Sequence, residues 1–217
     1  MTIHMEDLLN SIMESFDRID HIRSKDIPNI DLYMDQVTTL MQDRLKNTTR
    51  YPEQDKILTK TMINNYTKNN LLPPPLKKKY SREHVMILIF IYYFKGFMSI
   101  NDIQTVLKPL TERYFGKTDG PALEDIYEEV FSLEKEQVEA LKRDVMDKFR
   151  RAEKTFPDAG NGQEEQDFLR FFSFVCMLSF DVYVKKLLIE KLLDAYVQAE
   201  TEGNGKGKKG AVQREEG

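Results

Sequence analysis

Apolar residues recur every three or four positions over most of the chain, so the sequence predicts an all-α, mainly helical fold. Residues 5–23 carry one amphipathic stripe, which has to be covered by the C-terminal helices or by a partner subunit. A second helix is expected over residues 34–46. A third helix is expected over residues 59–69, with Ile63 and Tyr66 facing inward because they are three positions apart.

The most apolar stretch of the chain predicts the central helix of the core. This helix spans residues 82–96, and residues 85–94 are apolar on every side, which is typical of a helix buried all round. Ser99 and Asp102 are expected to cap the next helix together, and Pro109 to mark its end. The inward positions of that helix are Ile100, Ile103, Val106, Leu107 and Leu110.

Two long helices are expected after a glycine-containing loop at residues 114–121. The first spans residues 122–156, with irregular spacing that allows a break near Ser132. The second spans residues 166–197, and its phenylalanine-rich first half has more apolar surface than one partner helix can cover. That surplus predicts burial among several helices or a dimer interface. Residues 199–217 are rich in glycine and charge and are expected to be disordered.

Positive charge is concentrated in one segment of the chain. Residues 44–82 contain ten Lys or Arg and two acidic residues, a net charge of +8; subtracting this from the formal total of −4 leaves −12 for the remainder. Such segregation is typical of a nucleic-acid-binding surface on an acidic protein. Within it, Lys77, Lys78 and Lys79 are consecutive and repel one another, which a bound phosphate relieves. By itself a run of lysines is more often simply solvated.

The third predicted helix has a polar outer face. The outward positions are Lys60, Asn64, Thr67 and Lys68. These side chains can reach phosphates or base edges, and Asn64 is the best candidate for reading a base because its amide can pair bidentately with adenine. Asn70 is expected to end this helix in a left-handed conformation, and the prolines at 73–75 stiffen the exit.

These segments together resemble a known DNA-binding motif. The run TKTMINNYTKNNLLPP, then KKKYSREHV, then an apolar helix closing in KGFMSINDIQTVL, resembles the MerR-type winged helix-turn-helix, and in particular an uncharacterised MerR-like family of low-GC Gram-positive bacteria. Residues at matching places are Tyr66, Leu71, Leu72, Pro73, Tyr80, Gly96, Phe97, Ile100, Ile103 and Leu107. Asn64 stands where that family usually has Arg, Asn70 stands where it has Gly, and residues 47–56 are an insert.

The resemblance covers roughly residues 31–110 and implies a winged helix-turn-helix with a small β wing, to which the apolar spacing adds an N-terminal helix and a C-terminal hairpin of long helices. Together these expectations divide the chain into an N-terminal helix (1–27), the winged unit (28–113), a helical dimerisation region (114–198) and a disordered tail (199–217). The resemblance comes with a function as well. It also implies a dimeric transcriptional regulator that binds double-stranded DNA. The residues expected at the DNA are Lys60, Asn64, Thr67, Lys68, Lys77, Lys78, Lys79, Tyr80 and Arg82.

Two other interpretations stay open. The chain can be a non-enzymatic protein-interaction module that uses a winged-helix scaffold to bind an acidic protein, which the absence of the family's Arg at position 64 favours. A small-molecule effector bound among the phenylalanine-rich C-terminal helices is compatible with DNA binding.

The sequence offers no enzymatic chemistry, metal site or cofactor site. It has no phosphate-cradling glycine motif, and His4, His21 and His84 are scattered rather than spaced as metal ligands. The single cysteine, Cys176, is expected to be a buried, inert thiol. No apolar run reaches the roughly 18–20 residues of a membrane span, and the acidic N-terminus does not resemble a signal peptide. A cytoplasmic protein without membrane contact is therefore expected.

Overall fold

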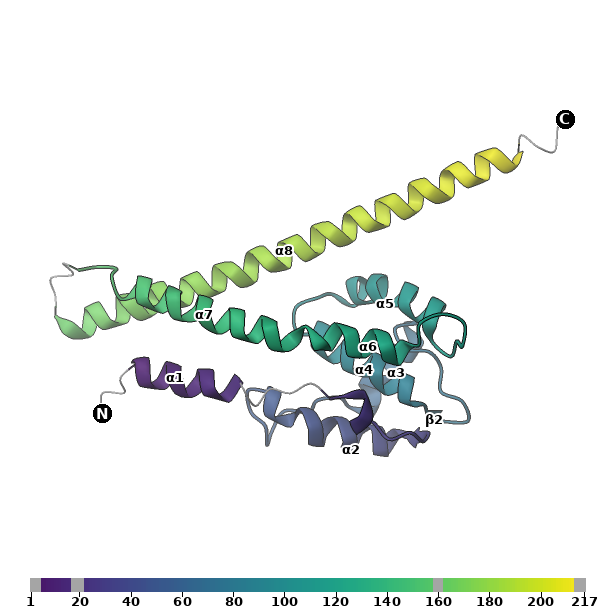
Figure 1. Ribbon diagram of the computed structural model, residues 1–217, viewed down its shortest axis with the longest axis horizontal. Helices are drawn as coiled ribbons and strands as arrows, with labels where there is room; N and C mark the ends of the chain where they lie inside the picture. The colour runs from purple at the N-terminus through teal and green to yellow at the C-terminus, as the bar shows by residue number, and fades with distance from the viewer. Residues whose placement is uncertain (1–4, 17–21, 158–161, 213–217) are drawn as a thin grey trace.

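The buried centre of the protein is α4 (Arg82–Phe94), as its run of apolar residues predicts (Figure 1). Every residue from His84 to Ile91 is buried, since other helices cover this part of α4 on all sides. This computed structural model describes residues 5–16, 22–157 and 162–212. Within these ranges the fold is mainly helical, with a small two-stranded sheet at its edge.

The elements follow the predicted order closely. They are α1 (Met5–Phe16), η1 (Ser24–Asp26), β1 (Leu32–Tyr33), α2 (Met34–Leu45), η2 (Lys46–Thr48), α3 (Lys60–Lys68), β2 (Lys79–Tyr80), α4, α5 (Ile100–Tyr114), α6 (Leu123–Ser132), α7 (Glu134–Ala152) and α8 (Gln163–Val212). The strands β1 and β2 pair antiparallel, with Leu32 opposite Tyr80 and Tyr33 opposite Lys79.

The larger hydrophobic core surrounds α4 and is built by helices α2 to α6 together with Ile22 and Ile27, which flank η1. The α6 helix belongs to this core rather than to a C-terminal region beginning at residue 114. Tyr127 of α6 is fully buried, its ring lies 5.5 Å from that of Phe90, and its hydroxyl donates to the carbonyl of Ile22. These contacts move the boundary between the two parts of the protein from residue 113 to the end of α6.

A second, smaller core joins α1 to the C-terminal helices. Leu9 and Met13 of α1 pack with Val145 and Phe149 of α7 and with Phe174 of α8. This confirms that the N-terminal amphipathic helix packs on the C-terminal helices. The described part of this helix is Met5–Phe16, and residues 22 and 23 are not helical. Residues 17–21, which the sequence also assigns to it, lie outside the described residues.

The α5 helix corrects two predictions. It begins with the expected capping box, in which Ser99 and Asp102 exchange hydrogen bonds, but it continues through Pro109 to Tyr114. A proline inside a helix costs about 3 kcal/mol. The cost is offset because Leu110 and Tyr114, beyond the proline, pack against the larger core. Ile100, expected inside, is 44% exposed because it lies at the open end of the helix.

The long C-terminal helices differ from prediction in their bounds. The first is interrupted at Leu133 and forms α6 and α7, which agrees with the irregular spacing near Ser132. The second, α8, is 50 residues long and continues through the segment expected to be disordered, up to Val212. Extending an existing helix adds one hydrogen bond per residue without a new nucleation cost, and this favours continuation.

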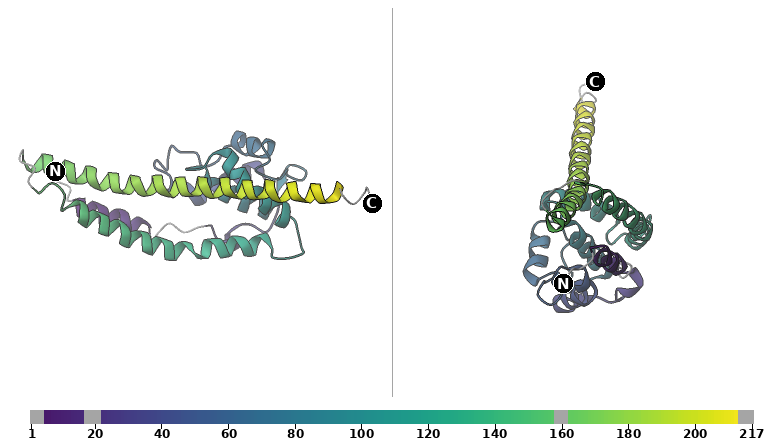
Figure 2. Two further views of the ribbon diagram at one scale, coloured as in Figure 1. Left: turned by 90° about the horizontal axis from the view of Figure 1, so that it is seen from above. Right: turned by 90° about the vertical axis from the view of Figure 1, so that its left-hand side faces the viewer.

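Much of α8 is not covered by the other described segments. It packs on α7 near its start, touches α5 further along, and then projects away from the body of the protein (Figure 2). Cys176, expected to be buried, is therefore exposed. Of the helices in the described ranges, none is long and apolar enough to cross a membrane.

Candidate nucleic-acid interface

The α3 helix presents the polar face that the sequence predicts. Its N-cap is Thr59, whose hydroxyl accepts the Met62 amide at 3.2 Å, and Ile63 and Tyr66 are buried. The side chains of Lys60, Asn64 and Lys68 are exposed, as expected for positions four apart on the opposite face. Thr67 is half-buried and its hydroxyl donates to the carbonyl of Ile63 at 3.3 Å, so it is partly engaged within the helix.

The α3 helix ends through backbone geometry that fixes the following segment. Asn70 has a φ of 56°, which confirms its left-handed conformation. The Asn70 amide donates to Thr67 and the Leu71 amide to Tyr66, at 3.2 and 2.9 Å, forming a Schellman motif. Leu71 and Leu72 then turn into the core. The start of the proline run is thereby anchored beside α3.

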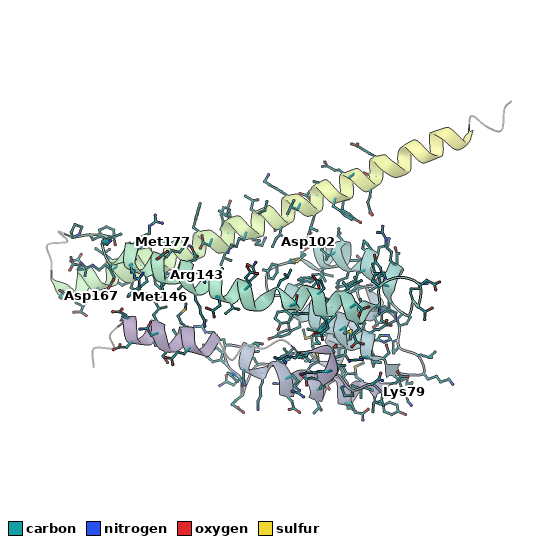
Figure 3. All side chains as sticks on the ribbon, viewed as in Figure 1. Lys79, Asp102, Arg143, Met146, Asp167 and Met177 are labelled. Atoms are coloured by element: carbon teal, nitrogen blue, oxygen red, sulfur yellow. The ribbon has the colours of Figure 1, made fainter. Side chains whose placement is uncertain are left out.

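Residues 76–79, here called the basic turn, form a tight hairpin. Leu76 and Lys79 are bridged as antiparallel partners, and the Lys79 amide donates to the Leu76 carbonyl at 2.9 Å. The two central residues, Lys77 and Lys78, have φ values of 50° and 63°. Positive φ at both central positions is the backbone of a type I′ turn, which Asn and Gly normally occupy. Lys77 and Lys78 are exposed, and the neighbouring Lys79 lies at the edge of the protein (Figure 3).

An ion pair connects α3 to the sheet that carries the basic turn. Lys60, the first residue of α3, pairs with Asp35 in the first turn of α2, directly after β1. Both side chains are mostly exposed, so solvent screens the pair and a phosphate can compete for the lysine. The ion pair therefore places the start of α3 near the end of β1.

Tyr80 does not lie on the outer face of the sheet, which corrects the prediction that it contacts DNA. Its side chain is buried, and its ring packs edge-on against His84 with 5.5 Å between ring centroids. Burial raises the pKa of the Tyr80 phenol. The alternation of the strand explains the position: Lys79 faces outward, so the next residue faces the core.

Arg82 also has a structural role instead of the predicted phosphate contact. Its guanidinium donates two hydrogen bonds to the carbonyl of Ser24 and pairs with the Glu124 carboxylate at 2.8 Å. The side chain is only 22% exposed. Arg82 therefore fastens η1 and α6 to the start of α4, because its planar fork satisfies a carbonyl and a carboxylate together.

His84 is a buried group whose importance the sequence did not indicate. Its Nδ1 accepts the Ser81 amide at 2.9 Å and caps α4, and its Nε2 makes no hydrogen bond among the described residues. Desolvation by burial lowers the pKa of His84, while the carbonyls of Pro73 and Pro74 and the charge of Asp31 act in the opposite direction. The Ser-x-x-His spacing resembles a capping box and was the only signal in the sequence.

The insert at residues 47–56 is tied to the core more closely than an exposed flexible loop. Gln42 donates to the carbonyl of Asp55 and accepts the amide of Ile57, at 3.3 and 3.2 Å. Lys95 donates to the carbonyl of Ile57 at 2.6 Å, and burial lowers the pKa of this lysine. These contacts hold the insert against α2 and α4, and so define where its basic residues lie.

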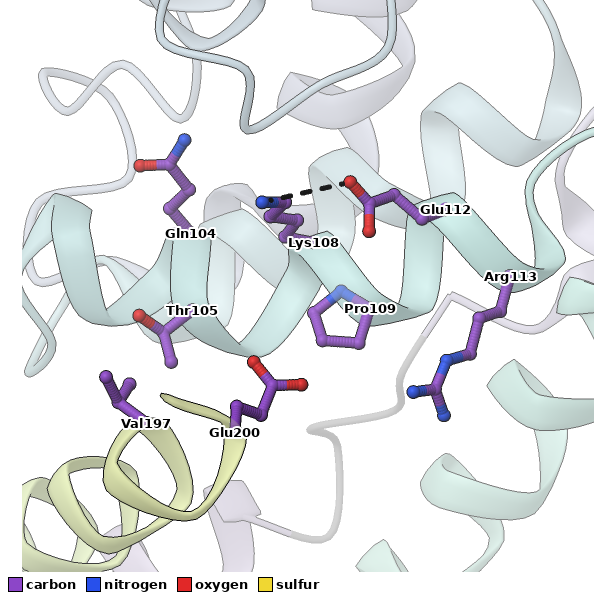
Figure 4. A pocket seen from close by; sticks show the side chains of 8 residues that line it. All are labelled: Gln104, Thr105, Lys108, Pro109, Glu112, Arg113, Val197 and Glu200. Atoms are coloured by element: carbon purple, nitrogen blue, oxygen red, sulfur yellow. Dashed lines mark ion pairs between the residues drawn. The ribbon is translucent and has the colours of Figure 1, made fainter. Parts of the chain in front are cut away.

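A cleft of about 730 Å³ lies between α5 and the distal part of α8 (Figure 4). It is lined by Gln104, Thr105, Lys108, Pro109, Glu112, Arg113, Val197 and Glu200. Lys108 and Glu112 face each other at 3.9 Å, and the lining is balanced in charge. The cleft is away from the phenylalanine-rich first half of α8, where the sequence places a possible effector. No cluster of three or more metal-ligating side chains occurs in the described parts of the chain.

Comparison with known proteins adds a family but no function. No curated protein and no solved structure matches the chain. A family model does match, and its limits nearly coincide with the larger core, whose members run from Ile22 to Tyr127. The α7 and α8 helices lie outside the match. Residues 22–130 match the family described as Domain of unknown function (DUF1836), and the chain belongs to that family.

Proposed function

We propose that the protein is a dimeric DNA-binding regulator that places α3 in the major groove and the basic turn on the phosphate backbone. The observation that carries this proposal is the set of exposed side chains formed by Asn64 and Lys68 of α3 and by Lys77 and Lys78 of the basic turn. It lies in a segment with a net charge of +8 on a chain whose formal total is −4. The resemblance to MerR-type proteins supports the same arrangement.

Each exposed side chain has a distinct role in this proposal. Asn64 pairs with an adenine edge, because its amide offers one donor and one acceptor in the major groove. Lys60 and Lys68 flank it toward the phosphates, and Lys60 exchanges Asp35 for a phosphate on binding. Lys77 and Lys78 hold the backbone. Tyr80 and Arg82 support this surface from inside and make no contact with DNA.

The exposed face of α8 supports a dimer. Apolar residues recur every seven positions along it, which is the spacing of one of the two seam positions in a coiled-coil heptad. They are Phe168, Val175, Val182, Ile189 and Tyr196. Four of the five are exposed in the single chain and Ile189 is half-buried, so this seam has little cover within one subunit. A second copy paired along α8 covers it and brings two DNA-binding surfaces together.

The proposal is tested by fluorescence anisotropy on a labelled duplex of random sequence at low and moderate salt. The wild-type protein is expected to bind with an affinity that falls steeply with salt. A variant with Lys77→Glu, Lys78→Glu and Lys79→Glu should lose binding while keeping its circular dichroism spectrum. Each phosphate that a variant no longer neutralises reduces the slope of log affinity against log salt by about 0.9.

The matched control reverses three exposed lysines outside the basic segment: Lys25→Glu, Lys117→Glu and Lys154→Glu. It changes the net charge equally and should retain most of the affinity. An equal loss of affinity in both variants would show that overall charge causes the effect, and it would contradict the assigned surface. Absence of binding by the wild type at low salt would favour the alternative, an interaction module for an acidic protein, and a pull-down would follow.

A further inference from the structure

The outer face of the small sheet carries an apolar and cationic row that the sequence does not reveal. Lys79 is the bridge partner of both Tyr33 and Leu76, so these three side chains lie next to one another across three segments. Directly opposite residues point to the same face, and here that face is exposed, whereas Leu32 and Tyr80 are buried on the other. The Lys79 ammonium lies 5.3 Å from the centroid of the Tyr33 ring.

Leu76 is conspicuous in this row because the described parts of the chain leave it largely uncovered. It is 73% exposed, and Tyr33 beside it is 55% exposed. The turn that presents Leu76 is itself unfavourable: two lysines adopt positive φ where Asn and Gly would adopt it freely. An uncovered leucine and a strained turn at the same tip both cost stability in the free protein, which points to a contact made there with a partner.

We infer that Leu76 enters the minor groove of duplex DNA as an apolar wedge, while Lys77 and Lys78, at the adjoining tip of the turn, bind phosphates at the rim of the groove. This inference rests on the proposed DNA-binding function and extends it to a second groove. The minor groove is about 6 Å wide, which excludes a helix but admits the tip of a two-residue turn. An apolar side chain inserted there separates neighbouring base pairs and kinks the duplex.

Charge complementarity identifies the partner. An apolar side chain next to three cations matches a groove whose floor is formed by base edges and whose rims are phosphates. Lys60, at the start of α3, pairs with Asp35 two residues after Tyr33, so the start of α3 lies near this row. Tyr33 lies next to Lys79 and at the edge of this contact, where its ring packs against a sugar.

The absence of tryptophan from the chain permits a direct test. Leu76→Trp places the only indole of the protein at the tip of the turn. Val130→Trp, on the exposed face of α6 and outside the basic segment, is the matched control. Acrylamide quenching is measured with and without a saturating mixed-sequence duplex at low salt. The duplex is expected to protect the indole of L76W severalfold and to leave that of V130W unchanged.

A second readout measures the kink without altering the leucine to an aromatic residue. A duplex carrying a donor and an acceptor dye at its two ends should shorten when the wild-type protein or Leu76→Met binds. Leu76→Ser should bind with a smaller loss of affinity than the triple lysine reversal, because the phosphate contacts remain. It should not shorten the duplex.

The outcomes separate this inference from the proposed function. If the protein binds the duplex but L76W remains as accessible to acrylamide as in the free protein, the wedge is wrong and DNA binding stands. If the wild type binds no duplex, both proposals fail. Protection of L76W by vesicles of phosphatidylserine and phosphatidylcholine, without protection by DNA, would likewise overturn both and identify a lipid surface as the partner.

Discussion

Lys79 holds its ammonium group over the ring of Tyr33, with 5.3 Å between the nitrogen and the ring centroid. The two residues are far apart in the sequence and meet only because β1 and β2 pair in one register. A cation–π contact at such an exposed site contributes about 0.5–1 kcal/mol. It stabilises the pairing of β1 with β2, from which the basic turn projects.

Replacing Lys77 and Lys78 should change the stability of the protein and its affinity for DNA in opposite directions. Lys77→Asn with Lys78→Gly suits the left-handed backbone at both positions, so the free energy of unfolding should rise by about 1 kcal/mol. Affinity for duplex DNA should fall, because two charges are removed. Lys77→Gln with Lys78→Gln removes the same charges but keeps the strained turn, and should weaken binding without raising stability. Urea denaturation measures the free energy of unfolding, and fluorescence anisotropy measures the affinity for DNA. Equal stability of the two variants would show that the turn is not strained.

Arg82 should matter for stability and not for DNA. Arg82→Met leaves the Ser24 carbonyl and the Glu124 carboxylate without their donor, and the free energy of unfolding should fall by about 2 kcal/mol. Arg82→Lys keeps the charge but cannot satisfy both partners with a planar fork, so it should also destabilise the protein. Neither variant should change the salt dependence of DNA binding. A reduced salt slope in Arg82→Lys, measured by anisotropy, would instead place this residue at a phosphate.

His84 should make the protein less stable in mild acid. Burial lowers the pKa of His84 in the folded state, so the unfolded chain takes up its proton first as the pH falls. The contribution of His84 is complete above the unfolded pKa of about 6.5 and is lost as the pH falls from there through the folded pKa. His84→Gln retains a capping side chain at the same position and should flatten this part of the profile. The check is urea denaturation of both proteins at about pH 7.5 and about pH 5.5; parallel losses of stability would exclude His84 as the cause.

A charge in the α8 seam should prevent dimer formation. Val182 is 64% exposed and belongs to the seven-residue repeat, so Val182→Glu places a carboxylate in the dimer interface. Tyr183 is 62% exposed but lies outside the repeat, and Tyr183→Glu should leave the dimer intact. Sedimentation velocity should show a monomer only for the first variant. A monomeric wild type, or equal effects of the two changes, would remove α8 as the dimer interface.

The predicted α3 illustrates what local sequence can specify. Its start at Thr59, its inward pair Ile63 and Tyr66, and its left-handed end at Asn70 were all predictable. Each depends on neighbours within a few positions: a hydroxyl that accepts a nearby amide, apolar spacing on one helix face, and the tolerance of Asn for positive φ. The buried α4 and the cap at Ser99 were predictable for the same reason.

The candidate site itself was only partly predictable. Three of the four outward positions of α3, Lys60, Asn64 and Lys68, were correct because helical periodicity alone assigns them to a face, whereas Thr67 is half-buried. Tyr80 and Arg82 were assigned to the DNA surface because they adjoin a basic run, yet one is buried and the other is bound to Ser24 and Glu124. The exposure of Leu76 was not predictable, since it depends on a two-residue turn in which neither central residue is Asn or Gly.

The helices, their caps, most of their buried faces and the concentration of positive charge could be predicted, because they depend on residues within one or two turns of each other. The contacts between residues distant in the sequence could not, since they arise only in the tertiary structure. It placed Arg82 between η1 and α6, carried α5 past Pro109, moved α6 into the larger core, and aligned Leu76, Lys79 and Tyr33 on one exposed face. These outcomes depend on strand register and on long-range packing. Their energies exceed the local conformational preferences of single residues, and they produce no periodic pattern in the sequence.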